Sequence, residues 1–179
     1  MNGILDSNFT YYRISANIPV TFGPAEEAER YEIISVINQV AAERIYLQTD
    51  QYHPTATWER LLGRGIQLDE RLALFVVKYN DGIIGFGRLT PETEILFGNV
   101  GIALLRPFRS IGIGTALLEF LIHWADRLGY ERMTADILAT NIRSIRLFRR
   151  FHFQACDIHL IQSPFSTEKI QEITFELEL

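Results

Sequence analysis

Residues 104–115 read Leu104-Leu105-Arg106-Pro107-Phe108-Arg109-Ser110-Ile111-Gly112-Ile113-Gly114-Thr115, between an apolar strand at 100–105 and an amphipathic helix at 114–128. Two glycines at a spacing of two let the backbone turn tightly, so that successive N–H groups converge on one point. That point lies at the positive end of the following helix, which makes it a ready anion site. Arg109 adds a cation beside it, and the chemistry of the loop fits a diphosphate.

Two other phosphate-binding loops fit these residues poorly. A Walker A loop ends in Gly-Lys-Ser/Thr, whereas Thr115 follows Gly114 directly and no lysine stands between them. A dinucleotide-binding fingerprint needs a third glycine where Leu117 stands, and it needs its glycines directly after the strand. Residues 106–109 intervene here. A loop that only turns a corner is the alternative to an anion site.

The rest of the chain alternates between strand and helix patterns. Apolar periodicity and turn residues predict strands at 18–22, 73–79, 83–89, 100–105, 133–137 and 172–179, and helices at 25–43, 55–63, 114–128 and 141–151. Asn80-Asp81-Gly82 predicts a tight hairpin turn. This order predicts an α+β fold with a mixed sheet. Residues 1–16 are interpreted as an N-terminal extension and 17–179 as a single domain.

The composition argues against several classes of protein. With 179 residues, 47% of them hydrophobic and 22% charged, the chain has the composition of an ordinary globular protein. The apolar runs are far shorter than a membrane span needs, and no signal segment opens the sequence. A net charge of −5 argues against coating of nucleic acid. A single cysteine, Cys156, and four histidines without metal-ligand spacing argue against a metal site. We therefore expect no metal, nucleic-acid or membrane partner and a cytoplasmic location.

A second motif stands at 137–153. It reads Ile137-Leu138-Ala139-Thr140-Asn141-Ile142-Arg143-Ser144-Ile145-Arg146-Leu147-Phe148-Arg149-Arg150-Phe151-His152-Phe153. Together with Arg109-Ser110-Ile111-Gly112-Ile113-Gly114, it resembles the GNAT superfamily of acyl-CoA N-acyltransferases, whose pattern is Arg/Gln-x-x-Gly-x-Gly/Ala, then Asn-x-x-Ala/Ser, an aromatic residue and Gly-Phe. The segment Glu43-Arg44-Ile45-Tyr46-Leu47 is similar to one in phosphinothricin-type and related small acetyltransferases.

The resemblance covers roughly residues 18–179 and implies the GNAT fold, a mostly antiparallel sheet of about seven strands flanked by about four helices. It also implies acetyl-CoA as cosubstrate. The implied cofactor-binding residues are Leu104, Leu105, Arg106, Arg109, Ser110, Ile111, Gly112, Ile113, Gly114, Thr115, Asn141, Ser144 and Phe148. The backbone N–H of Leu104 is the implied oxyanion donor, a role typically worth ~2.7–4 kcal/mol. The arginines of the helix at 141–151 are interpreted mainly as a solvated face, with a contact to the nucleotide 3′-phosphate as the alternative.

Three positions depart from the superfamily pattern. Phe148 stands where a tyrosine general acid is frequent, His152 replaces the glycine of the Gly-Phe pair, and Asn99 stands where a strand glutamate often sits. Because an alkyl thiol titrates near ~8.5, the leaving thiolate needs little protonation. The missing acid therefore predicts a slow enzyme or a substitute donor. The candidate donors are Tyr46, Ser144, Cys156 and a bound water.

The general base and the acceptor site have candidates as well. Glu43, at the end of the first helix, and Glu94, before the strand at 100–105, are the nearest carboxylates that could take a proton, directly or through water. Tyr46, Tyr52 and Trp58 cluster in the region that lines the acceptor site in similar proteins. They predict either an aromatic substrate pocket or core packing.

These observations predict an acetyl-CoA-dependent N-acetyltransferase in which a primary amine attacks directly in a ternary complex. The acceptor is a small molecule, an amino acid or a protein amine. The alternatives are a CoA-binding sensor or regulatory module with weak or no catalysis, and a structural protein that has lost the cofactor. Because similar proteins often pair through their C-terminal strands, we also expect that the chain can form a homodimer.

Overall fold

The computed structural model describes residues 5–6, 9–13, 18–92 and 96–179. Its helices are α1 (Arg30–Ala41), α2 (Ala56–Gly63), α3 (Ile113–Arg127) and α4 (Ile142–Arg150), with the short 3-10 helices η1 (Glu27–Glu29) and η2 (Arg106–Phe108). Its strands are β1 (Leu5–Asp6), β2 (Phe9–Arg13), β3 (Pro19–Pro24), β4 (Ile66–Gln67), β5 (Leu72–Tyr79), β6 (Gly82–Pro91), β7 (Phe97–Leu104), β8 (Arg132–Leu138), β9 (Gln154–Gln162) and β10 (Lys169–Glu178).

All ten strands belong to one sheet, in the order β1-β2-β3-β5-β6-β7-β8-β10-β9, with β4 paired to β5. The expected α+β fold with a mixed, mostly antiparallel sheet is confirmed. The sequence patterns predict no strand at the positions of β1, β2, β4 or β9. Both β1 and β2 come from the segment interpreted as an N-terminal extension, and β2 pairs with β3. Without β1, β2 and β4 the sheet has seven strands, which is the number that the resemblance implies, although β9 has no counterpart among the predicted ranges.

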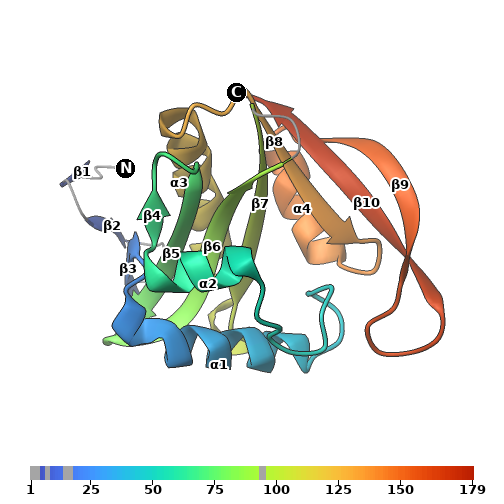
Figure 1. The fold of residues 1–179 in the computed structure, drawn as a ribbon, viewed down its shortest axis with the longest axis horizontal. Coiled ribbons are helices and arrows are strands. Elements are labelled where there is room, and N and C mark those ends of the chain that lie inside the picture. The colour runs from blue at the N-terminus through green and yellow to red at the C-terminus, as the bar shows by residue number, and fades with distance from the viewer. Residues whose placement is uncertain (1–4, 7–8, 14–17, 93–95) are drawn as a thin grey trace.

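The pair formed by β7 and β8 determines where a ligand can reach the backbone of the sheet. Neighbouring strands are antiparallel except β7 and β8, which run parallel and pair only at Phe97↔Arg132, Gly98↔Met133 and Asn99↔Thr134. Beyond Asn99 the two strands diverge (Figure 1). The carboxyl half of β7 therefore has one edge that no described strand covers, and its backbone groups are available to a ligand.

Helices cover both faces of this sheet (Figure 1). On one face α3 and α4 contribute buried residues to the larger core, among them Leu117, Leu121, Ile145 and Phe148. On the other face α1 and α2 form the second core, with Ile33, Ile37, Leu61 and Leu62. The apolar stripes of these helices face the sheet, as their helical periodicity predicts.

Three turns follow the local chemistry of their residues. The hairpin between β5 and β6 uses Asn80 and Asp81 at φ 48° and 65°, as the Asn-Asp-Gly sequence predicts. Gly129 ends α3 at φ 74° and donates its N–H to Asp126 O. His152 adopts φ 67°, so the turn after α4 keeps the left-handed conformation that the glycine of the superfamily pattern favours.

The first helix is shorter than the range predicted at 25–43. It consists of η1 followed by α1, which ends at Ala41, and Arg44 then turns left-handed at φ 57°. Glu43 therefore lies beyond the helix, in a turn that directs the chain toward the end of β7. Within the described ranges, no helix is long and apolar enough to cross a membrane.

Candidate active site

A cavity of about 310 Å³ lies where β7 and β8 have diverged, between the loop before α3 and the start of α4. Many of the residues implied as cofactor-binding line it: Leu104, Arg109, Ser110, Gly112, Gly114, Thr115, Asn141 and Ser144. We refer to it below as the loop cavity.

The end of β7 presents backbone groups to the loop cavity. Leu105 donates its N–H to Ile84 O at 2.8 Å, so Leu104, one residue earlier and opposite Gly85, occupies a non-hydrogen-bonded position of the ladder. In an antiparallel pair the N–H and C=O of such a residue point away from the neighbouring strand. Since β8 has diverged here, the Leu104 N–H faces the cavity, and the same alternation applies to Ile102.

The N-terminus of α3 forms the opposite wall. Gly112 caps the helix at φ 95° and Ser110 stands at φ 62°, so the chain turns sharply before the helix begins. The first N–H groups of a helix have no intrahelical acceptor, and those of this first turn lie beside Gly114 and Thr115 on the cavity wall. Together with the helix dipole, they suit an anion such as a pyrophosphate.

Arg109 is not the free cation that the sequence suggests. Its Nη1 and Nη2 bind both carboxylate oxygens of Glu43 at 2.8 and 2.6 Å, and its Nε donates to Leu104 O at 2.7 Å. The guanidinium also lies 4.3 Å from the ring centroid of Tyr46. The Arg109 side chain is 8% exposed, and its charge is neutralised by Glu43. Arg109 therefore stabilises the loop, and a direct contact with a phosphate is not its role.

The same ion pair argues against Glu43 as the general base. The hydrogen bonds from Arg109 lower the pKa of the Glu43 carboxyl below its ordinary value, against the opposing effect of burial. A carboxylate with both oxygens bound and a lowered pKa is a weak proton acceptor. The other candidate base, Glu94, lies outside the residues that the structure describes.

Arginines that form no ion pair with the described residues come instead from α4. Arg143, Arg146 and Arg150 line the loop cavity, so this arginine face is part of the cavity wall and not only a solvated surface. Their spacing of three and four residues already places them on one helix face. That spacing is the signal in the sequence, but it does not reveal which wall the face covers. Arginine side chains on such a wall suit the phosphates of a nucleotide.

Five implied cofactor residues do not line the loop cavity, namely Leu105, Arg106, Ile111, Ile113 and Phe148. The Leu105 N–H is occupied by Ile84 O, and Arg106 is exposed in η2. Ile113 is fully buried in the core and Ile111 packs against that core. Phe148 lines a second cavity instead.

This second cavity, of about 420 Å³, lies between the loop after α1, helix α2 and strands β6 to β8. Tyr46, Tyr52 and Trp58 all line it, which brings together the three residues proposed for substrate contact. Trp58 stands edge-on to Tyr52 and to Phe86, with ring centroids 6.1 and 5.9 Å apart. We refer to it as the aromatic cavity.

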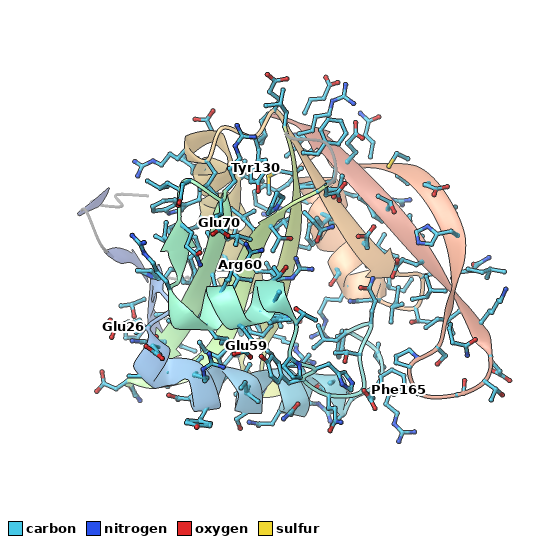
Figure 2. The ribbon with its side chains drawn as sticks, in the orientation of Figure 1. Glu26, Glu59, Arg60, Glu70, Tyr130 and Phe165 are labelled. Carbon is cyan, nitrogen blue, oxygen red and sulfur yellow. The ribbon has the colours of Figure 1, made fainter. Side chains whose placement is uncertain are left out.

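A hydrogen bond and a cation–π contact stabilise the segments around the aromatic cavity. Tyr52 Oη donates to Glu59 Oε1 at 2.8 Å, and burial, assisted by this bond, raises the pKa of Tyr52 to about 12. Outside the cavity lining, Arg44 lies 5.6 Å from the ring centroid of Phe165. Phe165 comes from the loop between β9 and β10 (Figure 2). The C-terminal hairpin thus closes against the loop that follows α1.

The two cavities meet. Tyr46, Ile102, Asn141 and Ser144 line both of them, so the backbone of Ile102 stands at the junction. Asn141 is only 5% exposed, caps α4 and accepts the Ser144 N–H on its Oδ1 at 3.1 Å. Its amide NH2 can donate a hydrogen bond to a ligand at the junction.

The position of the superfamily tyrosine carries no hydroxyl. Phe148 is 2% exposed, lines the aromatic cavity and packs edge-on against Phe153 with ring centroids 5.0 Å apart. Of the substitute donors, Tyr46 and Ser144 lie at the junction. Cys156 lies on β9 and lines neither cavity, and burial raises the pKa of its thiol.

Sequence patterns do not single out two charged residues of the aromatic cavity, Arg88 and Asp136. Arg88 lies across Gly101 of the neighbouring strand, where a Cβ would stand 3.0 Å from its Nε, and it donates to Thr90 Oγ1 at 2.9 Å. Burial lowers the pKa of its guanidinium, and Asp136 opposes this effect. Among the described residues, no carboxylate forms an ion pair with Arg88.

No group of three His, Cys, Asp or Glu side chains within the described part of the chain could hold a metal ion. The linings of the two cavities include backbone donors, arginines, the Asn141 amide and the Asp136 carboxylate.

Comparison with known proteins identifies the family of this chain. Residues 34–153 match the model of the acetyltransferase (GNAT) family, and the chain belongs to that family. A curated N-alpha-acetyltransferase from Sulfolobus acidocaldarius is 39% identical over 96 residues, which span 46% of this chain and 56% of that relative. The chain thus spans little more than half the length of the curated relative.

Solved structures share the fold. A GNAT-family acetyltransferase from Streptococcus pneumoniae superposes with a TM-score of 0.75 at 18% identity, covering 89% of this chain and 99% of that one. The Salmonella typhimurium protein yncA, solved with its cofactor acetyl-CoA, superposes with a TM-score of 0.75 at 19% identity, covering 89% and 94%. The resemblance to the GNAT superfamily is confirmed.

Proposed function

We propose that this protein is an acetyl-CoA-dependent N-acetyltransferase that transfers an acetyl group to a primary amine by direct attack in a ternary complex. The observation that carries the proposal is the junction of the two cavities at Ile102 and Asn141. The loop cavity offers the α3 N-terminus and the α4 arginines to the phosphates of CoA. The aromatic cavity then holds the acceptor on the other side of the junction.

The residues at the junction suit acyl transfer. When bound, the thioester supplies an electrophilic carbonyl carbon. The outward N–H groups of Ile102 and Leu104 are placed to stabilise negative charge on its oxygen, and Asn141 can donate to the pantetheine arm. The only thiol of the chain, Cys156, lines neither cavity, which favours direct attack over a cysteine relay.

Arg88 favours one class of acceptor. Its guanidinium lines the aromatic cavity without a carboxylate partner in the described chain, and a half-buried cation of this kind gains most from an anionic ligand group. We therefore propose a small acceptor that carries a carboxylate near its amine, as an amino acid does, ahead of a polyamine or a peptide. The cytoplasmic location stays a prediction.

Thermal unfolding with and without acetyl-CoA tests the cofactor. A ligand at a hundredfold excess over its Kd adds about 2.7 kcal/mol, which shifts the melting of a domain of this size by several degrees. We expect this shift with acetyl-CoA and not with the controls NADH and ATP. No shift with acetyl-CoA or CoA would contradict the proposal.

Release of free thiol from acetyl-CoA tests the reaction. The acceptor panel consists of L-methionine, L-phenylalanine, their two amides, spermidine and a short alanine-led peptide. We expect kcat/KM at least tenfold higher for the acids than for their amides, and Arg88→Gln should remove this preference. Binding of acetyl-CoA without thiol release for any amine would instead support a CoA-binding sensor.

A further inference from the structure

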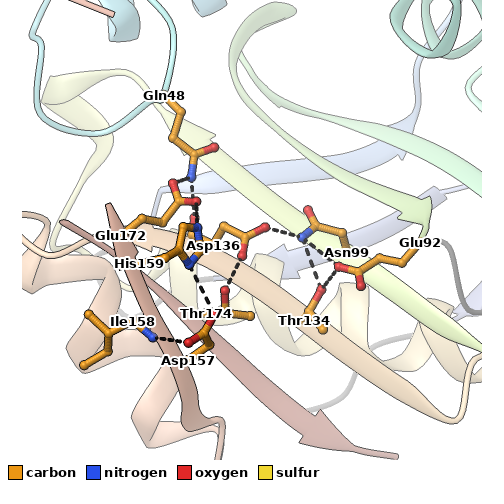
Figure 3. Close-up of polar contacts among 10 residues, drawn as sticks. All are labelled: Gln48, Glu92, Asn99, Thr134, Asp136, Asp157, Ile158, His159, Glu172 and Thr174. Carbon is orange, nitrogen blue, oxygen red and sulfur yellow. Dashed lines mark hydrogen bonds and ion pairs between the residues drawn. The ribbon is translucent and has the colours of Figure 1, made fainter. Parts of the chain in front are cut away.

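A polar network crosses the divergent end of β7 and β8, with Asp136 at its centre (Figure 3). Asn99 Nδ2 lies 2.9 Å from Asp136 Oδ2, and Thr174 Oγ1 donates to Asp136 Oδ1 at 2.8 Å. Asp136 is nonetheless exposed and lines the aromatic cavity. Each carboxylate oxygen can accept a further hydrogen bond from a group in that cavity.

The register of the strands places Asp136 nearer the junction than Asn99. Asn99 is level with Thr134, at the last paired position of β7 and β8. Asp136 lies two residues further along β8, on the same face as Thr134, and two strand residues advance by about 6.6 Å. The carboxylate therefore stands where the strands have separated, toward the Ile102 end of the cavity.

Asn99 donates from its amide to the Asp136 carboxylate, which a glutamate at this position could not do. Its Nδ2 also lies 3.4 Å from Glu92 Oε1, so the amide stands between two carboxylates and must turn its NH2 toward them. A glutamate at this position, as in the superfamily pattern, would set a third negative charge against Asp136 and Glu92. The amide instead orients Asp136, and the negative charge stands on β8 rather than on β7.

We propose that Asp136 is the general base of the reaction, with Asn99 and Thr174 as positioning residues. This rests on the proposed N-acetyltransferase function. Asp136 takes one proton from the acceptor ammonium, directly or through water, and the freed amine forms a C–N bond to the thioester carbonyl carbon. The C–S bond breaks, the second proton of the nitrogen goes to the departing sulfur, and Asp136 returns its proton to solvent.

Other charged and titratable groups surround Asp136 and enter any pH profile. They are Arg88 on β6, Glu92 beyond β6, Glu172 on β10, Cys156, Asp157 and His159 on β9, and His53 on the cavity wall. Burial, and then the charge of Asp136, raises the pKa of the Glu172 carboxyl. Glu172 does not line the cavity and is bound by Gln48 and His159, so it is a neighbour and not a second base.

The first test is Asp136→Asn, measured as kcat/KM for L-methionine and L-phenylalanine between pH 6 and 10. We expect a fall of about 10²- to 10⁴-fold near neutral pH, the usual size of a general-base contribution. The deficit should shrink as the pH approaches the pKa of the acceptor amine, because acceptor that is already neutral needs no base. The matched control is Asp126→Asn on α3, an exposed carboxylate outside both cavities and outside this network, which should leave the profile unchanged.

The second test moves the carboxylate back to β7. In the double variant Asn99→Glu with Asp136→Asn, the glutamate faces an amide in place of Asp136, and we expect at least tenfold recovery over Asp136→Asn alone. A purely structural role of Asp136 predicts no such recovery. The thermal shift with acetyl-CoA should be the same in all variants, since the network lies outside the loop cavity.

Three results would overturn the assignment in an active wild-type enzyme. These are unchanged turnover in Asp136→Asn, a loss of turnover that is independent of pH, and the absence of any recovery in the double variant. A wild-type protein that acetylates no amine of the panel contradicts the proposed function itself, and the assignment of Asp136 falls with it.

Discussion

The ion pair between Arg109 and Glu43 is a structural brace at the mouth of the loop cavity. It joins residues 66 positions apart in the chain and also holds Leu104 O at the end of β7. Replacing Glu43 by glutamine leaves a largely buried guanidinium without its counter-charge. We expect a loss of about 1–3 kcal/mol in the free energy of unfolding at pH 7, measured by urea denaturation. The exposed Glu131→Gln is the control.

The pH dependence of this loss has a definite sign. The pKa of Glu43 is lowered in the folded protein, so its contribution is fully present above its unfolded pKa, near 4.5, and is lost as the pH falls through the folded value. The difference between wild type and Glu43→Gln should therefore be constant above about pH 5 and shrink below pH 4.5. A difference that grows on acidification would contradict the assigned pair. If Glu43 is not the base, the variant also keeps the wild-type pH profile of turnover.

Phe148 tests whether the reaction gains from a general acid at the position of the superfamily tyrosine. It lines the aromatic cavity. In the superfamily pattern a tyrosine that acts as general acid is frequent at this position. We expect Phe148→Tyr to raise kcat by about tenfold, less than the usual 10²- to 10⁴-fold of a general acid, because a departing thiolate needs little protonation. Phe153→Tyr, on the neighbouring buried ring, is the control. No gain in Phe148→Tyr would show that the proton comes from elsewhere, with Tyr46 and Ser144 next to test.

Among the elements, the N-terminus of α3 depends on the backbone conformation of its glycines to present N–H groups to a pyrophosphate. Gly112 stands at φ 95°, a conformation that L side chains rarely adopt, whereas a Cβ on Gly114 would meet only ordinary contacts at 3.5 and 3.6 Å. We expect Gly112→Val to weaken acetyl-CoA binding at least 100-fold by calorimetry. Gly114→Ala should keep affinity within a few fold. Equal effects of the two substitutions would contradict the assignment of the loop as the pyrophosphate site.

The divergence of β7 and β8 organises both cavities. It exposes the outer edge of β7 to the loop cavity and separates Asp136 from the opposite strand, so one topological feature supplies the backbone donors and the carboxylate. The α4 arginines and the α3 N-terminus then close the gap from one face, and the loop after α1 closes it from the other.

In the whole molecule, the outer edge of the last strand of the sheet pairs with no other strand of the described ranges. Strand β9 is the terminal strand, and its exposed side chains include Ile158 and Leu160, at 61% and 59% exposure. Apolar side chains on an open edge favour pairing with another strand. We propose that two copies of the chain associate through this hairpin.

Light scattering coupled to gel filtration tests the association. We expect the mass of two chains for the wild type at tens of micromolar, and the mass of one chain for the double variant Ile158→Lys with Leu160→Lys. The exposed Leu68→Lys, far from β9 in the sequence, is the control. A wild-type mass of one chain across the concentration range would contradict the proposal.

Local sequence determined much of this protein. The Asn80-Asp81 turn, the Gly129 cap, the glycine loop before α3 and the Asn141 cap of α4 each follow from residues a few positions apart, because φ preferences and helix ends are local properties. The two motifs, and with them the family, also lie in contiguous segments.

Only the tertiary structure decided which charged side chains are bound by a partner and which line a cavity without one. Arg109 and Glu43 lie 66 residues apart and Asn99 and Asp136 37 apart, and no spacing in the sequence encodes these contacts. The pairing of β7 with β8 stops at Asn99, and this sets which backbone groups, arginines and carboxylates line the cavities. The sequence therefore gives the position and type of each charged side chain. Strand register and packing decide which partner it binds, and the partner decides whether the charge can act on a ligand.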